Sequence, residues 1–175
     1  MGHHRYAIEA RLCGSLRRII GAAGFMLRGS EARGGERPRG LDNLLHEAVE
    51  NIAEAFVIYD AEDRFVLCND AYRCLYAENA HAFVPGARYV DIMRSALAVG
   101  RYPEAKGREE EWLSEWMRRH RESAATVESQ LKDGRWVMVS ERRMPSGGVA
   151  GLRVDITALK TVETSLEESR AELGK

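Results

Sequence analysis

Cysteine and proline are both scarce in this chain of 175 residues, which contains three cysteines and four prolines. No two cysteines have the Cys-x-x-Cys spacing that zinc sites and dithiol redox sites use. A small fold held together by disulfides needs several cysteine pairs. The sequence therefore excludes a disulfide scaffold, and it indicates neither a zinc site nor a dithiol redox centre.

Long apolar runs and a strong net charge are also missing. The longest apolar run near the N-terminus covers residues 19–27, whereas a membrane-spanning helix needs about 20 apolar residues. The net charge of −1 gives the chain as a whole no basic footprint for nucleic acid. We therefore expect no transmembrane segment and no nucleic-acid partner.

Charge is nevertheless uneven, because residues 1–40 contain eight arginines and three acidic residues. Arg17 and Arg18 precede the apolar run, an order typical of targeting peptides, and a helix here could also lie on an anionic membrane. A weakly packed lead-in is the third interpretation, and we favour it because the glycines in the run weaken a helix. Residues 29–40 have the composition of a linker. We interpret residues 1–40 as a basic, weakly structured extension.

The rest of the chain alternates between strand and helix patterns. Apolar residues between Leu41 and Ile52 recur at three- and four-residue steps, as on one face of a helix. Asn69 and Asp70 offer capping side chains for a short helix, and the dipeptide Asp-Gly at 133–134 predicts a hairpin turn. The expected strands are residues 56–59, 65–68, 126–131, 136–142 and 149–156, and the expected helices are residues 71–78, 89–99 and 109–122. This order predicts an α+β domain with an antiparallel sheet.

The last segment, residues 158–175, has the pattern of a helix with a narrow apolar seam. Thr157 can cap this helix, and its apolar residues fit the a and d positions of two heptads. A stripe so narrow buries little surface against a sheet. We therefore favour a homodimeric coiled coil over packing against the chain's own domain. The expected interface residues are Leu159, Val162, Leu166 and Leu173.

Several segments carry local motifs. These are Phe56-Val-Ile-Tyr-Asp60 with Arg64-Phe-Val-Leu-Cys-Asn69, then Asp70-Ala-Tyr72, Gly134-Arg-Trp-Val-Met-Val-Ser-Glu-Arg-Arg143 and Asp155-Ile-Thr157. In this order and spacing they resemble the PAS sensory domain, and in particular a bacterial signal-transduction subgroup with a D-I-T end motif. The resemblance covers residues 41–160. It implies a PAS domain at 41–157 with a five-stranded antiparallel sheet, helices on one face and flanking N-terminal and C-terminal signalling helices.

The D-I-T motif implies a point of signal transmission formed by Asp155, Ile156 and Thr157. The expected last strand ends at Ile156 and the helix begins at once, so that a rotation of the sheet can pass into the helix. Two interpretations of Asp155 are open. It pairs with an arginine of the neighbouring strand, such as Arg142 or Arg143, or it begins the helix in contact with solvent.

Neither catalytic nor cofactor-binding motifs stand out. His46 precedes an acid, as in some phosphorylated histidines, but no ATP-binding region follows, and we interpret it as a surface residue. No catalytic residue, metal site or enzymatic activity is expected. The cysteine motif of the flavin-binding light sensors in this family is missing around Cys74, and the expected central helix at 89–99 has no histidine for heme. The cofactor is unknown, and we expect neither a flavin adduct nor heme.

A small apolar ligand in the interior and a simply packed core both fit the apolar residues of the domain. We favour packing, and strand alternation alone does not reveal which residues point inward. The candidate pocket residues are Phe56, Ile58, Tyr72, Tyr76, Ile92, Leu97, Trp136, Met138 and Val154.

The resemblance implies a cytoplasmic sensor or interaction module of a bacterial two-component or related system. Such a module dimerises and relays a change caused by a ligand or partner through its C-terminal helix. The output is a histidine kinase, a cyclic-dinucleotide enzyme or a separate partner protein. The alternative is a PAS dimerisation scaffold that senses nothing.

Overall fold

The computed structural model describes residues 39–122 and 126–173. The predictions for residues 1–38 lie outside the described residues. Within them, five strands form one sheet in the order β2-β1-β5-β4-β3, and every neighbouring pair is antiparallel. The strands are β1 (Ala55–Tyr59), β2 (Phe65–Cys68), β3 (Val127–Gln130), β4 (Trp136–Arg143) and β5 (Val149–Asp155). This confirms the predicted α+β class with a five-stranded antiparallel sheet.

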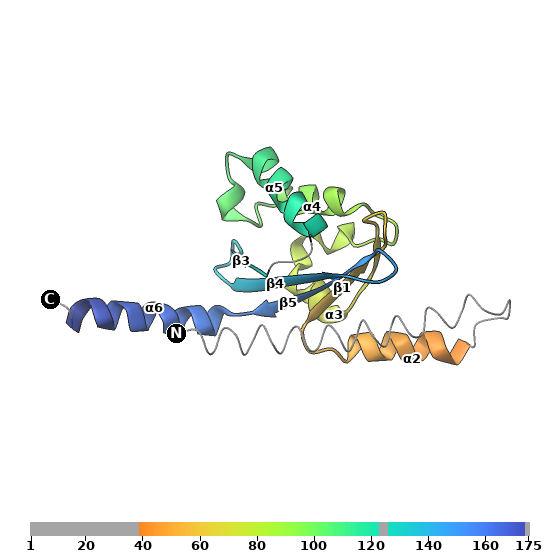
Figure 1. Ribbon diagram of the computed structural model, residues 1–175, viewed down its shortest axis with the longest axis horizontal. Coiled ribbons are helices and arrows are strands. Elements are labelled where there is room, and N and C mark those ends of the chain that lie inside the picture. Colours follow the sequence, from red (N-terminus) through yellow and green to blue (C-terminus); the bar gives the residue numbers. More distant parts are fainter. Residues whose placement is uncertain (1–38, 123–125, 174–175) are drawn as a thin grey trace.

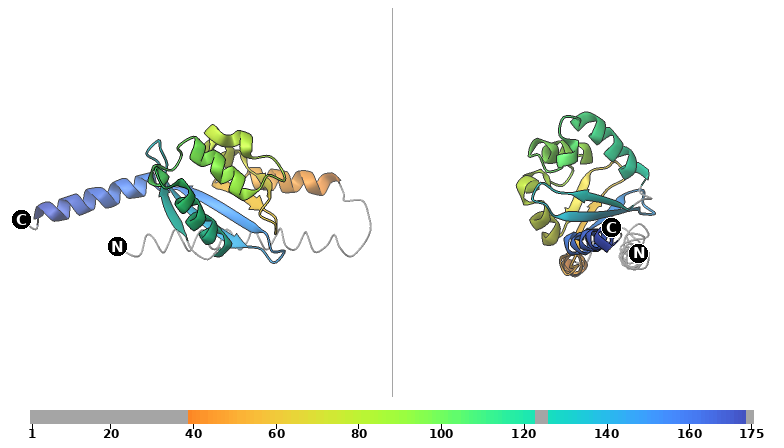
Figure 2. Two further views of the ribbon diagram at one scale, coloured as in Figure 1. Left: turned by 90° about the horizontal axis from the view of Figure 1, so that it is seen from above. Right: turned by 90° about the vertical axis from the view of Figure 1, so that its left-hand side faces the viewer.

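The helices lie on both sides of this sheet. Figures 1 and 2 show α4 and α5 over one face, which we call the helical face, while α2 and α6 lie towards the other, the outer face. Helices α2 and α6 point away from the sheet in opposite directions (Figure 1). The α-helices are α2 (Arg39–Glu50), α3 (Asp70–Leu75), α4 (Tyr89–Ala98), α5 (Glu109–Glu122) and α6 (Thr157–Leu173), and the 3-10 helices are η1 (Ala77–Ala82) and η2 (Pro103–Ala105).

Asn69 fixes the start of the domain, as its predicted capping role requires. Its Oδ1 accepts hydrogen bonds from the backbone N–H of Tyr72 at 3.0 Å and of Phe56 at 2.9 Å. Its Nδ2 donates to the carbonyls of Ile52 at 3.1 Å and Glu54 at 2.9 Å. One buried amide thus caps the N-terminus of α3 and ties it to β1 and to the connection between α2 and β1.

The hairpin turns follow the local chemistry of the sequence. In the turn between β1 and β2, Asp60 Oδ1 accepts from the backbone N–H of Glu62 at 3.0 Å and of Arg64 at 2.8 Å. Asp63 completes this turn with φ of 56°, in the left-handed region. Gly134, at φ of 88°, does the same in the predicted turn between β3 and β4, where the absence of Cβ removes the steric cost.

The sheet is buried on both faces. On the outer face, the buried residues Phe56, Met138 and Leu152 belong to one cluster, against which Val49 of α2 and Leu159 of α6 pack. A larger cluster on the helical face joins alternate residues of β1 and β4, such as Val57 and Val137, to helices α3, α4 and α5. The strands β1, β4 and β5 are therefore almost wholly buried, instead of alternating between apolar and polar side chains.

Candidate functional site

The junction between β5 and α6 is held by a short chain of hydrogen bonds. Asp155 Oδ1 accepts from the backbone N–H of Thr157 at 2.9 Å and from its hydroxyl at 2.6 Å. The Thr157 hydroxyl oxygen in turn accepts from the backbone N–H of Trp136, the first residue of β4, at 2.9 Å. Ile156 between them is buried and donates its N–H to the Trp136 carbonyl at 2.8 Å. The start of α6 is thus fixed to the ends of two strands, with no free linker between sheet and helix.

The structure decides between the two interpretations of Asp155. Across the β4–β5 ladder it stands opposite Val137, whereas Arg142 and Arg143 stand opposite Ala150 and Val149 at the far end of these strands. Of the two open interpretations, the pairing with Arg142 or Arg143 is therefore wrong, because the antiparallel register separates the two ends. The other interpretation, in which Asp155 begins the helix in contact with solvent, is confirmed. Asp155 caps α6, and it remains exposed to solvent.

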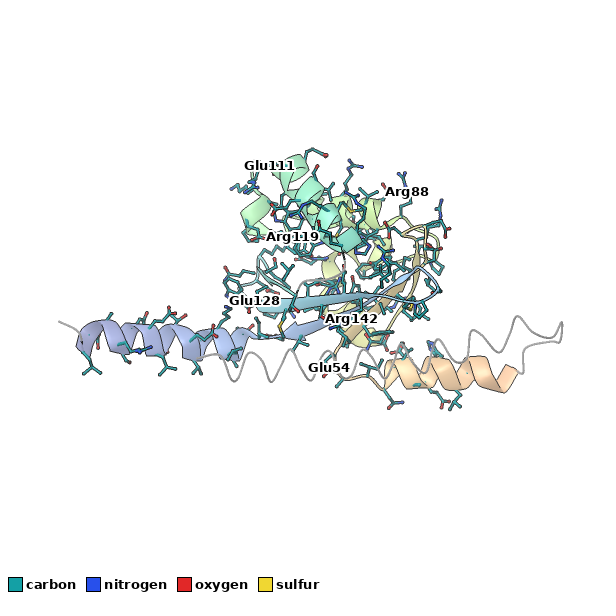
Figure 3. All side chains as sticks on the ribbon, viewed as in Figure 1. Glu54, Arg88, Glu111, Arg119, Glu128 and Arg142 are labelled. Carbon is teal, nitrogen blue, oxygen red and sulfur yellow. The ribbon has the colours of Figure 1, made fainter. Side chains whose placement is uncertain are left out.

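A lysine of α6 pins its first turn to the sheet. Lys160 Nζ lies 2.6 Å from Glu128 Oε2 of β3, a residue labelled beside the start of α6 in Figure 3. The same ammonium lies 5.2 Å from the ring centroid of Trp136, within cation–π range. The hydrogen bond to Glu128 raises the pKa of Lys160, so that the side chain stays charged at neutral pH. This contact fixes the first turn of α6 to β3.

Beyond that turn, the apolar seam of α6 faces solvent. Leu159 is partly buried against the outer-face cluster, whereas the exposed fractions of Val162, Leu166 and Leu173 are 56%, 50% and 89%. No residue of α6 is buried in the single chain. The predicted interface residues thus divide into one that packs on its own domain and three that contact little of the described chain. Their role in a dimer stays a prediction.

The candidate pocket residues do not line one cavity, because the sheet separates them. Tyr72, Tyr76, Ile92 and Leu97 belong to the helical-face cluster. The other five belong to the outer-face cluster, and these are Phe56, Ile58, Trp136, Met138 and Val154. Assigning all nine to a single pocket was therefore wrong. The candidates on β1, β4 and β5 all have the parity that points to the outer face, away from α4 and α5.

The helical face is occupied largely by packed aromatic rings. The rings of Tyr59 and Tyr89 lie 4.8 Å apart, those of Tyr72 and Tyr76 also 4.8 Å, and those of Tyr72 and Phe83 5.1 Å, all between centroids in edge-to-face arrangements. Such contacts stabilise a core beyond the area that they bury. Burial raises the pKa of Tyr59, Tyr72 and Tyr89 well above its ordinary value, so these phenols are neutral near pH 7.

Charged residues lie inside this aromatic shell, which sequence analysis did not anticipate. Glu141 of β4 and Arg153 of β5 are both buried, and Glu141 Oε1 lies 2.6 Å from Arg153 Nη2. The other carboxylate oxygen, Oε2, lies 2.6 Å from Nδ1 of His120, near the end of α5. His120 Nε2 lies 3.3 Å from Oδ1 of Asp63 in the β1–β2 turn. We call these four residues the ionic core.

Glu141 is ionised in this environment despite its burial. Desolvation alone would raise its pKa, but the charge of Arg153 and the hydrogen bond and charge of His120 outweigh it and lower the pKa to about 2. Space for the pair comes from Gly151, which stands opposite Glu141 in the sheet. A Cβ atom at Gly151 would lie 2.5 Å from Nη1 of Arg153.

One signal for the ionic core was present in the sequence. Glu141 follows Val137 and Val139 at two-residue steps, so it shares their face of β4. Arg153 follows Gly151 in the same way on β5. His120 gave no such signal, since its partners are 57 and 21 residues away along the chain.

The two described cysteines differ in exposure. Cys68 is buried, and desolvation raises the pKa of its thiol to about 11, while Cys74 is exposed. Cys74 borders a surface hollow of about 100 Å³. Two cations that line this hollow are already paired, Lys132 with Glu78 and Arg135 with Asp133, each at 2.6 Å. Across residues 39–122 and 126–173, no group of three or more His, Cys, Asp or Glu side chains is arranged to hold a metal ion.

Comparison with known proteins identifies the family. A family model described as the PAS fold matches residues 49–164. The chain belongs to the PAS family. The D-I-T junction and the ionic core both lie within the matched residues, so they are parts of the PAS domain itself.

Among curated proteins, the "Non-motile and phage-resistance protein" of Caulobacter vibrioides is 32% identical to this PAS chain over 159 residues. The match covers 89% of the chain but only 17% of that protein. No helix among the described residues of the PAS chain is long and apolar enough to cross a membrane.

Two solved PAS-type structures are similar at lower identity. The PAS domain from Bordetella pertussis BvgS is 20% identical with a TM-score of 0.41, and the match covers 75% of this chain and 99% of that one. A domain of the sensory box sensor histidine kinase/response regulator from Geobacter sulfurreducens is 18% identical with a TM-score of 0.43, covering 70% and 100% of the two chains.

Proposed function

We propose that this PAS domain is a signalling module that forms a homodimer through α6 and transmits changes in its sheet along that helix. The output is a histidine kinase, a cyclic-dinucleotide enzyme or a separate partner protein. The observation that carries the proposal is the junction at Asp155–Thr157. It joins α6 to the ends of β4 and β5 by direct hydrogen bonds and leaves the apolar seam of the helix facing solvent.

The mechanism follows from how α6 is held. A shift of β4 relative to β5 moves Trp136 and Asp155, and these two residues orient Thr157. Lys160 extends the connection to β3 through Glu128. A rotation of the sheet therefore becomes a rotation of the helix, and in a coiled-coil dimer two such rotations change the register of the seam.

The relationship to known proteins supports a signalling role. The curated relative is much longer than the matched region, so the module is a minor part of that protein. A domain that occupies so small a share of a long chain suits an internal relay. Its two flanking helices leave in opposite directions, which suits insertion between other segments (Figure 1).

The test replaces two exposed seam residues, Val162 and Leu166, by Asp in one variant. Burying an apolar side chain of this size contributes about 1.5–3 kcal/mol, and each 1.4 kcal/mol corresponds to about a factor of ten. The double variant should therefore weaken the dimer by about a hundredfold or more in analytical ultracentrifugation. Thr164→Asp with Ala171→Asp is the matched control, because both residues are exposed on other faces of α6.

The control should dimerise like the unmodified protein. A V162D/L166D variant that still sediments as a dimer at low micromolar concentration would show that α6 is not the interface. Folding is monitored by the far-ultraviolet circular dichroism of both variants, and it should be unchanged because neither residue is buried.

A dimerisation scaffold that binds no ligand is the second candidate, and the aromatic packing of the helical face favours it. Rings at 4.8 to 5.1 Å centroid separation leave little room for a guest beside the ionic core. Native mass spectrometry of the purified protein distinguishes the two. A carried small molecule that leaves on denaturation supports sensing of a ligand, and a mass equal to that of the bare chain supports the scaffold.

A further inference from the structure

His120 is held between two carboxylates in the interior of the domain. Its side chain has no solvent exposure, Nδ1 faces Glu141 at 2.6 Å and Nε2 faces Asp63 at 3.3 Å. Carboxylate oxygens accept hydrogen bonds, so each ring nitrogen makes a favourable contact only when it carries a proton. The geometry on both sides is therefore that of a doubly protonated, cationic imidazole.

Charged and titratable groups from several elements pack around the His120 ring. Glu141 is ionised and held by Arg153, while the tyrosines nearest the ring have raised pKa values and stay neutral. The titratable and charged groups facing the ring are Glu141 of β4, with Arg153 of β5 behind it, Asp63 of the β1–β2 turn, Tyr59 of β1 at 5.8 Å and Tyr89 of α4 stacked at 3.8 Å between centroids. On α5 itself, the neighbours are Trp116, which donates to the Tyr89 hydroxyl, and Arg119, paired with Glu115.

Asp63 connects the His120 contact to the start of α4. It has φ of 56°, a region that residues other than glycine seldom enter, although Asp and Asn do so more readily than most. Its carbonyl accepts the backbone N–H of Tyr89 at 2.8 Å, at the first residue of α4. The Asp63 carboxylate therefore links the end of α5 to a turn that also anchors the start of α4.

We propose that His120 is a proton-operated latch, in which the doubly protonated ring holds the β1–β2 turn against α5 and loss of the Nε2 proton to water releases that turn. After deprotonation, Nδ1 keeps its proton because the shorter contact is with Glu141. The lone pair on Nε2 then faces the Asp63 carboxylate, and the hydrogen bond becomes a repulsion. The Asp63 carbonyl loses its fixed position, and the first turn of α4 loosens with it.

The direction of the pH effect follows from this geometry. The latch is closed while the ring carries both protons, and it opens as a rising pH removes the proton from Nε2. It acts within one protomer, so it does not depend on dimerisation through α6. The latch therefore responds to the proton concentration.

The test is hydrogen exchange at the amide of Tyr89, followed by NMR at pH 6 and pH 8. A charge-assisted hydrogen bond is among the stronger contacts of a protein, so its loss should reduce the protection factor of this amide about tenfold between the two pH values. The ring nitrogens of His120, observed by their ¹⁵N shifts, should change from the doubly to the singly protonated form over the same range.

Two variants complete the test. Asp63→Asn keeps a residue that tolerates the left-handed region, and its amide can donate to a neutral Nε2 or accept from a protonated one, so protection of Tyr89 should become nearly independent of pH. His81→Gln, which removes an exposed histidine, should behave like the unmodified protein. The proposal is overturned if the His120 ring keeps one protonation state throughout, if Tyr89 is equally protected at both pH values, or if D63N shows the same fall.

Discussion

Glu141 shows how a single side chain ties the stability of this domain to pH. It is a buried carboxylate whose desolvation cost is outweighed by Arg153 and His120, which lower its pKa to about 2. A group whose pKa is lower in the folded state binds protons less well there than in the unfolded chain. Its contribution to stability is therefore complete above about pH 5 and is lost as the pH falls towards 2.

From this follows a prediction for Glu141→Gln. In the unmodified protein, this residue should contribute about 3 kcal/mol to the decrease in unfolding free energy between pH 5 and pH 2, at 1.36 kcal/mol per pKa unit. The variant should be destabilised by several kcal/mol at pH 7, because Arg153 is left buried without its partner. The unfolding free energy of the variant should also change less between pH 5 and pH 2.

Urea denaturation at a series of pH values measures both effects. Glu62→Gln is the matched control, since Glu62 is an exposed residue of the β1–β2 turn. If E141Q and E62Q gave parallel stability curves, the ionic core would not be the source of the acid sensitivity.

The two described cysteines give a second prediction at this scale. In a Cys13→Ser background, Cys74 should react rapidly with a thiol reagent at neutral pH, because it is exposed. Cys68 should react only as the domain opens, because it is buried and burial raises the pKa of its thiol to about 11. Mass spectrometry of the labelled peptides gives the two rates. Labelling of Cys68 as fast as that of Cys74 would contradict the packing of β2.

At the scale of the element, the start of α6 depends on one hydroxyl group. Thr157→Val keeps the shape of the side chain but removes the oxygen that accepts from Trp136 and the hydroxyl that donates to Asp155. Loss of such a cap costs about 0.5–2 kcal/mol. We expect a decrease of this size in the free energy of unfolding, together with faster hydrogen exchange at the Trp136 amide.

Thr157→Ser is the control, because it keeps the hydroxyl. Stability and exchange should then return close to those of the unmodified protein. Equal behaviour of T157V and T157S would mean that the hydrogen bonds of the junction contribute little, and the relay would lose its physical basis.

The sequence predicted the elements well where the signal was local. Asn69 caps α3 as expected, and Gly134 occupies the tight turn that Asp-Gly indicated. The expected helix at 71–78 is shorter in the structure, because α3 ends at Leu75 and a 3-10 helix follows. These features depend on neighbouring residues alone, which is why a pattern could reveal them.

The sequence did not reveal which side chains share a face. Phe56 and Val57 are adjacent and both fully buried, one on each side of the sheet, so hydrophobicity gives no alternation from which to choose. The ionic core was missed for a related reason. In the sequence, His120 lies in a segment with the pattern of a charged helix. The packing of α5 over the sheet brings it next to Glu141.

At the scale of the whole molecule, α2 and α6 extend from the sheet in opposite directions (Figure 1), and both carry exposed apolar residues. Leu44 on α2 is 57% exposed and Leu166 on α6 is 50% exposed. A dimer that covers such residues is favoured by mass action. The proposed homodimer therefore makes the stability of the domain depend on protein concentration.

We expect the melting temperature to rise as the protein concentration is raised, because association stabilises the folded state. The V162D/L166D variant should melt at a temperature that does not change with concentration. Differential scanning calorimetry over a wide concentration range measures this. A melting temperature that is independent of concentration in the unmodified protein would indicate a monomer.

The fit between Gly151 and the guanidinium of Arg153 constrains how this protein can change by mutation. A side chain gained at position 151 would press on the guanidinium, and Arg153 lost first would leave Glu141 buried without its partner. A single substitution at Gly151, Arg153 or Glu141 thus destabilises the fold, whereas a simultaneous change of all three to apolar residues preserves a packed core. We expect natural selection to have entrenched the three positions, so that related sequences inherit or lose them together.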